Sequence, residues 1–190
     1  MILEGLITSV SNSGVWNVAP MGPLVDETLS HLVLRPFQTS TTCQNLQQTR
    51  CGVLHVVDDV LILAQAAIGR LTEFPPHQPA VKIPGRVLTD ACRWFEFEVT
   101  EIDDSQPRVT MQARVVHSEH LRDFFGFNRA KHAVLEAAIL ATRLHLLPAE
   151  EIRRDFERFA VIVQKTAGPR ETAAFRLLEE YVRDHLSEPR

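Results

Sequence analysis

Residues 35–46, RPFQTSTTCQNL, gather hydrogen-bonding groups around one fixed cation, Arg35. The segment holds three threonines, one serine, one asparagine, two glutamines and no acid. A guanidinium can bind two oxygens of a phosphate monoester, and hydroxyls and loop amides can complete a cage without adding charge. We interpret the segment as a phosphate cradle whose groups are Arg35, Thr39, Thr41 and Thr42, with Asn45 fixing the loop or reaching a ring carbonyl. The alternative, an ordinary polar loop, is favoured by composition alone.

The segment WNVAPMG, residues 16–22, lies at the end of a predicted strand and offers a second group of candidates. Asn17 is polar, Met21 could pack on a flat ring, and Gly22 would allow close approach of the backbone. An ordinary strand end followed by a turn explains the same residues equally well. Phe37 similarly could stack on a ligand ring or fill the core, which is the more common fate of a phenylalanine.

A third candidate is GFNRAK, residues 126–131, at the start of a predicted helix. Asn128 would cap this helix, which puts Arg129 and Lys131 in its first turn. Basic residues there oppose the helix dipole unless an anion or acid is near. This mismatch predicts a site for an anionic ligand; the alternative is a solvated first turn paired with Glu119 or Asp123.

Composition limits the classes of function. The chain has 190 residues, 45% of them hydrophobic, and a formal charge of 20 − 24 = −4, so we expect a globular protein that does not bind nucleic acid. Three cysteines without a CxxC motif, and no HExxH, predict reduced thiols and no metal site. The N-terminus lacks a signal-peptide pattern and no apolar run is long enough to span a membrane, so we expect a cytoplasmic protein.

The first two thirds of the sequence predict β structure. Strands are expected over residues 2–10, 14–20, 29–35, 51–57, 92–102 and 108–118, with a helix over 58–70 capped by Asp58 or Asp59 and a proline-rich loop over 73–86. In the fifth strand Phe95, Phe97 and Val99 alternate with polar residues that include Glu96, which predicts one wet face. This number of mostly consecutive antiparallel strands is typical of a small barrel.

The last third predicts three helices, over residues 128–147, 148–165 and 168–186. The first carries one apolar stripe, which would allow close packing between helices: Ala130, Ala133, Val134, Ala137, Ala138, Ala141 and Leu144. We therefore expect an α+β protein with a barrel domain over residues 1–125 and a helical subdomain over 126–190.

Several motifs occur together in one order: ILEGLITS…WNVAPMG, RPFQTSTTCQNL, VVDDV, ACRWFEFEV and GFNRAKHAVLEAAILATR. In this the chain resembles the DUF447 family, which is similar to the flavin-reductase-like, FMN-binding split barrels. The resemblance implies an antiparallel split barrel, a homodimer, and FMN near the subunit interface. It also assigns the FMN phosphate to Arg35, Thr39, Thr41, Thr42 and Asn45. Where many members have NVTDD, this chain has HVVDD, so His55 departs from the pattern.

The expected function is thus that of a flavin-dependent oxidoreductase or flavin reductase, in which FMN carries hydride or electrons. Simple flavin reduction requires no side-chain acid or base, so no catalytic residue is predicted. Two alternatives remain: a flavin carrier without turnover, and a pterin-binding protein linked by the family resemblance to tetrahydromethanopterin-dependent one-carbon metabolism. The sequence contains no GxGxxG, GxxxxGK or GxSxG motif, so it gives no support to Rossmann, P-loop or serine-hydrolase chemistry.

Overall fold

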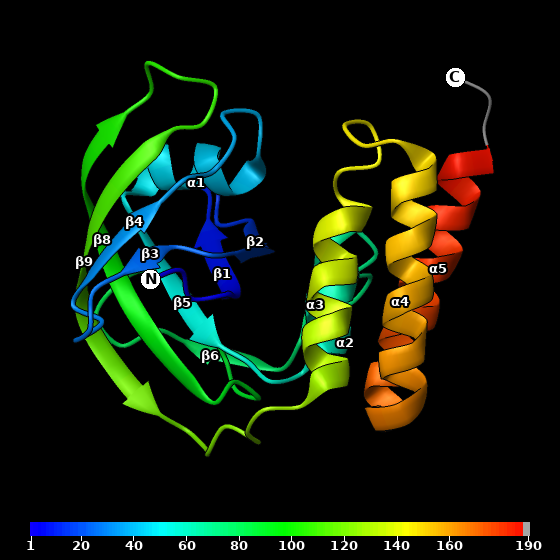
Figure 1. Ribbon diagram of the computed structural model, residues 1–190. Coiled ribbons are helices and arrows are strands. Elements are labelled where there is room, and N and C mark those ends of the chain that lie inside the picture. Colours follow the sequence, from blue (N-terminus) through cyan, green and yellow to red (C-terminus); the bar gives the residue numbers. More distant parts are fainter. Residues whose placement is uncertain (188–190) are drawn as a thin grey trace. The chain divides into compact units, whose positions relative to one another are not determined.

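The computed structural model describes residues 1–187 and divides the chain into two compact units (Figure 1). The barrel unit contains residues 1–57 and 75–124, and the helical unit contains residues 58–74 and the chain from residue 125 onward. The sequence-based division after residue 125 differs in one respect, because residues 58–74 group with the helices.

A seven-stranded antiparallel sheet in the order β2-β1-β5-β8-β9-β4-β3 forms the barrel unit. Its strands are β1 (Gly5–Val10), β2 (Trp16–Met21), β3 (Leu24–Val25), β4 (His31–Leu34), β5 (Cys51–Val56), β8 (Arg93–Asp103) and β9 (Thr110–His120). The sheet curls around α1 (Thr41–Thr49), as Figure 1 shows. This arrangement confirms the predicted split barrel, and the first two predicted strands pair as an antiparallel hairpin, β1 with β2.

One face of the curled sheet holds the larger core of this unit. Ile7, Leu54 and Phe95 are fully buried there together with Cys43 and Leu46 of α1. These three residues lie opposite one another on β1, β5 and β8, and the next residue on each strand points to the other face of the sheet. α1 is therefore packed against the sheet by its apolar side.

The opposite face is covered by a short hairpin, β6 (His77–Pro79) and β7 (Arg86–Leu88), where the sequence predicted only a loop. Val53 and Trp94 are buried under it together with Val87. The predicted wet face of β8 is wrong at Glu96, which is fully buried. Its carboxylate accepts hydrogen bonds from the amides of residues 81, 82 and 83 at 2.7, 2.7 and 3.2 Å, so it fixes the loop inside this hairpin.

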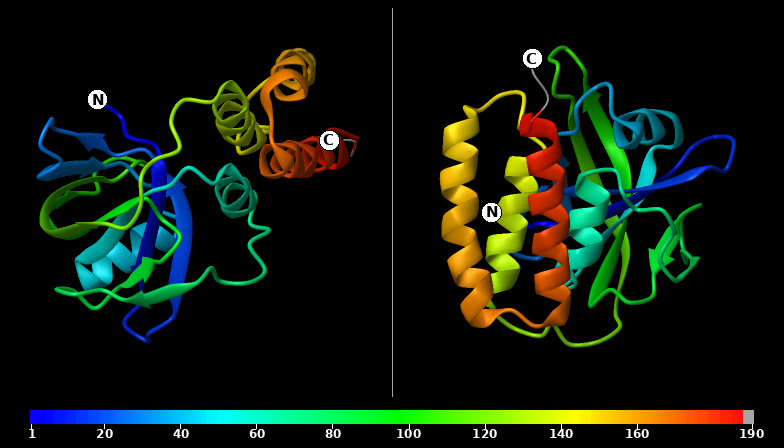
Figure 2. Two further views of the ribbon diagram at one scale, coloured as in Figure 1. Left: turned by 90° about the horizontal axis from the view of Figure 1, so that it is seen from below. Right: turned by 90° about the vertical axis from the view of Figure 1, so that its right-hand side faces the viewer.

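Four helices make up the helical unit: α2 (Val60–Ala67), α3 (Arg129–Ala141), α4 (Ala149–Thr166) and α5 (Pro169–Ser187). They run side by side in Figure 2. The alanine and valine positions of the stripe predicted for α3 are all buried in the core of this unit. The stripe thus serves the close packing of helices within one chain. Over residues 1–187, no helix has the length and apolar character needed to cross a membrane.

Candidate functional site

The phosphate-cradle segment is a strand end, a turn and the first turns of a helix, rather than the loop that the sequence predicted. Arg35 follows β4 directly, and α1 begins at Thr41. Ser40 is the N-cap, because its hydroxyl accepts a hydrogen bond from the amide of Cys43 at 3.2 Å. The first backbone amides of any helix have no acceptor within the helix, and this cap supplies an acceptor for one of them.

The turn before α1 is held by the tip of the β8–β9 hairpin. The amide of Gln38 donates to the carbonyl of Pro107 at 3.1 Å, and its side-chain amide donates to the carbonyl of Asp104 at 3.1 Å. The amide of Val109 donates to the carbonyl of Pro36 at 3.0 Å. Segments about 70 residues apart in sequence are thereby joined at one end of the barrel, so the turn before α1 is fixed to the tip of this hairpin.

Two arginines with different surroundings lie in this region. Arg35 is exposed and has no hydrogen bond or ion pair with any residue in the described part of the chain. Arg108, which the sequence analysis did not single out, lies with its guanidinium carbon 4.4 Å from the centre of the Phe37 ring. Phe37 is 52% exposed, so it is available to a ligand rather than used in the core. Arg108 is brought to this region by an isolated β-bridge between residues 37 and 108. No local sequence signal indicates that Arg108 lies near the predicted site.

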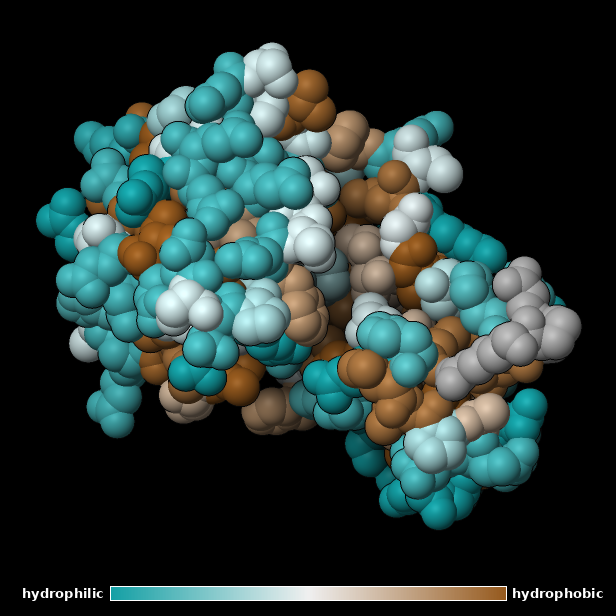
Figure 3. Space-filling model, turned by 90° about the horizontal axis from the view of Figure 1, so that it is seen from above, coloured by the Kyte–Doolittle hydropathy of each residue, from teal (hydrophilic) through white to brown (hydrophobic). Residues whose placement is uncertain are grey.

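The backbone at the start of α1 adds further donors. The amides of Thr39, Thr41 and Thr42 find no acceptor among residues 1–187, and the side chains of Thr39 and Thr41 are exposed. Seen from above, this end of the barrel unit is mainly hydrophilic (Figure 3). One acid is close: the pKa of Cys43 is raised by burial and, to a smaller extent, by the charge of Asp104. The region therefore combines unsatisfied donors with charges of both signs.

Thr42 and Asn45 differ from the other members of the predicted set, because both are buried on the side of α1 that faces the sheet. Thr42 accepts a hydrogen bond from the side chain of Asn17 on β2 at 3.0 Å. Asn45 donates to the hydroxyl of Ser9 on β1 at 3.1 Å. Asn45 thus fixes α1 through a side chain of the sheet, rather than through the loop backbone. Arg35, Phe37, Thr39 and Thr41 are the exposed members of the set.

Met21, the last residue of β2, is half-buried and packs against the barrel core. Gly22 follows it, and a β-carbon there would lie 2.6 Å from the carboxylate of Glu4, so the close approach that this glycine allows is to the N-terminal segment. The contact of Met21 with a ring ligand stays a prediction.

The predicted anion site at residues 128–131 has a different electrostatic balance from the one expected. Asn128 caps α3 as predicted, accepting from the amide of Lys131 at 3.1 Å. Lys131 forms an ion pair with Glu171 of α5 at 2.8 Å, and not with Glu119 or Asp123. Burial acts to raise the pKa of Glu171, but hydrogen bonds from Lys131 and backbone amides lower it overall.

Basic residues at this helix start suggested an anionic ligand. For Lys131, the carboxylate of Glu171 within the helical unit already supplies the negative charge. Arg129 is exposed and has no ion pair in the described chain. A ligand role for Asn128, Arg129 and Lys131 stays a prediction, and it now depends chiefly on Arg129.

His55, which departs from the family pattern, is fully buried on β5. One ring nitrogen, Nδ1, lies 3.2 Å from the carbonyl oxygen of Leu6, and the other, Nε2, accepts from the amide of Leu88 at 3.0 Å. The ring is thus neutral, with its proton on Nδ1. Burial lowers its pKa to about 4, with an opposing effect of the bond to Leu6. This histidine connects β1, β5 and β7, and its two ring nitrogens are both used in that role.

The sequence matches two parts of one family, described as protein of unknown function (DUF447): the N-terminal domain over residues 3–122 and the DUF447 region that follows over residues 128–180. Together these matches span most of the chain, so this protein belongs to the DUF447 family.

Solved structures show the same fold. An FMN-bound DUF447 protein from Methanosarcina mazei superposes with a TM-score of 0.81 at 21% identity, covering 95% of this chain and 94% of that one. The flavin reductase HpaC, in complex with NADP+, gives a TM-score of 0.55 at 12% identity, covering 67% of this chain and 83% of its own. The 2-nitrobenzoate 2-nitroreductase NbaA of Pseudomonas fluorescens gives 0.51 at 19% identity, with 62% and 64% covered. The barrel is thus of the flavin-reductase-like type.

Proposed function

We propose that this protein binds FMN with the phosphate at the start of α1, and that it is a flavin-dependent oxidoreductase. The observation that carries the proposal is the unpaired Arg35, four residues before a turn whose amides at Thr39, Thr41 and Thr42 have no acceptor in the described structure. A phosphate monoester supplies the anionic oxygens that such donors require. The FMN-bound relative from Methanosarcina mazei, which shares the fold along nearly its whole length, supports the choice of flavin.

Each exposed group has a distinct part in this proposal. Arg35 binds two phosphate oxygens in a fork, and the hydroxyls of Thr39 and Thr41 complete the cage. Phe37 offers a flat apolar face, and Arg108 holds that ring from one side. Thr42 and Asn45 keep α1 against the sheet, so that its first amides stay directed at the phosphate. Bound FMN would supply the hydride or electron transfer, while the protein orients the ring and excludes water.

A direct test compares FMN with riboflavin, which has the same ring without the phosphate. Arg35→Ala should weaken FMN by about 1.5–3 kcal/mol, the value of a hydrogen bond to a charged group, or about ten- to a hundredfold in Kd. Riboflavin affinity should not change. Arg50→Ala is the matched control, because Arg50 lies at the opposite end of α1 and should leave both affinities unaltered. Equal FMN affinity in wild type and Arg35→Ala would remove Arg35 from the site.

Turnover separates the oxidoreductase from a flavin carrier. The protein loaded with FMN should lose its visible flavin absorbance on addition of NADH, NADPH or a reduced deazaflavin, and regain it with an electron acceptor. Retained flavin that no donor reduces would support the carrier instead. A protein that neither retains FMN nor quenches its fluorescence would contradict the whole proposal.

A further inference from the structure

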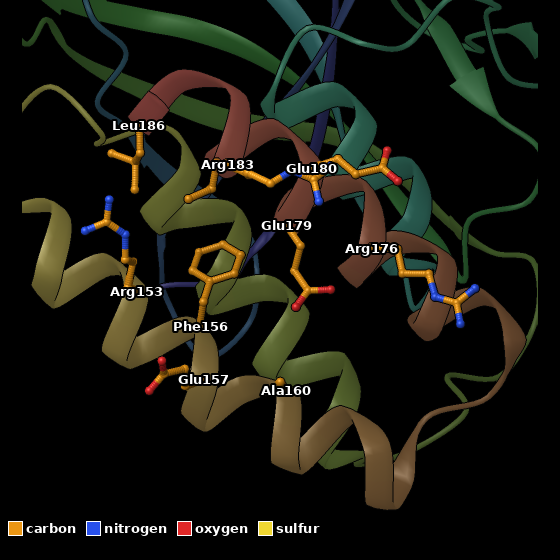
Figure 4. Close-up of a pocket in the computed structure, with 10 residues that line it drawn as sticks. Arg153, Phe156, Glu157, Ala160, Arg176, Glu179, Glu180, Arg183 and Leu186 are labelled. Atoms are coloured by element: carbon orange, nitrogen blue, oxygen red, sulfur yellow. The ribbon is translucent and has the colours of Figure 1, made fainter. Parts of the chain in front are cut away.

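Two features of the described chain lie outside the proposed flavin site. One is a groove of about 600 Å³ between α4 and α5, with Phe156 and Glu179 between the two helices (Figure 4). The charged side chains that line this groove are exposed, and nothing in the structure shows what would fill it. The other feature is the β6–β7 hairpin of the barrel unit, residues 77–88, whose attachment to the sheet depends on a few buried polar groups.

Side chains of the sheet, and not a β-ladder, attach this hairpin to the barrel. β6 and β7 form a two-stranded sheet of their own, separate from the seven-stranded sheet. Three neighbouring strands, β1, β5 and β8, each provide one buried polar side chain that bonds to the hairpin backbone. Thr8 donates to the carbonyl of Arg86 at 2.5 Å, His55 accepts from the amide of Leu88 at 3.0 Å, and Glu96 accepts from the amides of residues 81–83.

The hairpin contributes few side chains to the core. β6 is exposed along its whole length, and within residues 77–88 only Ile83, Val87 and Leu88 are buried. Trp94 is buried in the same small cluster as Val87, and its indole N–H has no acceptor within residues 1–187. An unpaired buried donor costs free energy that contact with water would recover. Few apolar contacts and an unsatisfied group are both typical of a segment that opens locally.

The attachment made by His55 depends on a single proton. Its Nε2 accepts from the amide of Leu88 through a lone pair, and a second proton there would place two donors face to face. The elements around the ring offer no free acid: β1 has no titratable side chain, β7 has only Arg86, and Glu96 on β8 is bonded to the three loop amides. On β5 itself the titratable neighbour is Cys51, whose pKa is raised by burial.

We propose that residues 77–88 are a pH-controlled lid, which lifts as a unit from an intact barrel sheet when His55 takes up a second proton from the solvent. Lifting moves the amide of Leu88 away from the protonated ring and gives the Nε2–H access to water. It also exposes the indole N–H of Trp94 and the apolar side chain of Val53 on the same face. Loss of the proton at higher pH restores the acceptor on Nε2 and closes the lid.

The size of the effect follows from the two states of the lid. The pKa of His55 is lowered by burial to about 4 in the closed state, and in the open state it returns toward the ordinary 6.5. Because the closed-state pKa is the lower one, closure is favoured above pH 6.5 and weakens as the pH falls toward 4. Opening should therefore become about thirtyfold more frequent between pH 7.5 and pH 5.

Amide hydrogen exchange of the full chain, resolved by NMR, tests the proposal. The amides of residues 81, 82, 83 and 88 bond to side chains of the sheet, so they report on lifting of the lid. Their protection factors, corrected for the pH dependence of intrinsic exchange, should fall together by about thirtyfold from pH 7.5 to pH 5, while amides of β1 and β5 stay more strongly protected. In His55→Asn this pH dependence should disappear. His77→Asn is the matched control, because His77 is an exposed histidine of the lid itself and its loss should leave the pH dependence unchanged.

Glu96→Gln tests whether the lid moves as one unit. At pH 7.5 this variant should lower the protection of residue 88 as well as that of residues 81–83, although Glu96 bonds only to the latter. A loss confined to residues 81–83 would overturn the proposal. So would wild-type protection that does not change with pH, a loss that spreads equally to β1 and β5, or a pH dependence that persists in His55→Asn. The wild-type pH profile decides the matter even where a variant does not fold.

Discussion

His55 makes the stability of the barrel unit depend on pH between about 4 and 6.5. The ring is fully buried, and both of its nitrogens are bonded to backbone groups of neighbouring strands. A second proton on Nε2 would break the bond to the amide of Leu88 and place a charge in the core. The folded protein therefore binds this proton only near pH 4, whereas the unfolded chain binds it near the ordinary value of 6.5.

The size of the effect follows from this difference of about 2.5 units, at 1.36 kcal/mol per unit, which gives about 3 kcal/mol. Because the folded-state pKa is lowered, the stabilisation is fully present above pH 6.5 and is lost as the pH falls toward 4. Below pH 4 both states carry the proton and this group causes no further loss. Carboxylates with a lowered pKa, such as Glu171, add a separate loss at acidic pH.

A comparison of wild type with His55→Asn isolates the contribution of the histidine. Both tryptophans, Trp16 and Trp94, lie in the barrel unit, so their fluorescence during urea unfolding reports on that unit. The difference in free energy of unfolding between the two proteins should change by about 3 kcal/mol from pH 7 to pH 4. The corresponding difference between wild type and His120→Asn, which replaces a 59% exposed side chain, should change far less over the same pH range. A difference that stays constant with pH would refute a buried neutral His55.

Three further substitutions test the internal contacts. Lys131→Met should lower the free energy of unfolding by about 3 kcal/mol by leaving Glu171 without its cation, and adding Glu171→Leu should restore part of this loss in chemical denaturation. Glu96→Gln should cost about 2 kcal/mol, because an amide NH2 would face backbone N–H donors, and should speed hydrogen exchange at residues 81–83. Asn45→Ala should lower the free energy of unfolding by about 1 kcal/mol and weaken FMN more than riboflavin, because it loosens the helix start that faces the phosphate; an equal loss for both ligands would contradict this positioning role.

Periodicity predicted the frame of the fold because most of its elements bury one regular face. Phe95, Phe97 and Val99 alternate along β8 as a strand requires, and the stripe of α3 repeats as a helix requires. Glu96 does not follow this pattern, because a carboxylate in a strand is normally exposed to solvent. Its burial is favourable here only because it accepts hydrogen bonds from three backbone amides of a loop 13–15 residues earlier. Partners of this kind are fixed by tertiary structure, so a single sequence does not reveal them.

The helix α1 was missed because its first turn lacks the usual local signals. Thr41 and Thr42 are β-branched, and the turn contains no acid, so propensity and charge both argue against a helix start. The signals present were the capping residue Ser40 and the spacing of Cys43 and Leu46, two buried residues one turn apart. Packing on the sheet outweighs the weak propensity of this segment.

The helical structure of α1 divides its polar residues between two faces. The period of the helix places Thr42 and Asn45, three residues apart, on the face toward the sheet, while Thr41 points outward. The inner pair replaces apolar contacts with specific hydrogen bonds to β2 and β1, which fix the rotation of the helix about its axis more strictly than apolar packing would. That rotation decides where the unsatisfied amides of the first turn point. The hydroxyl and amide groups of one short segment therefore serve two purposes: some offer donors to an anion, and the others hold those donors in place.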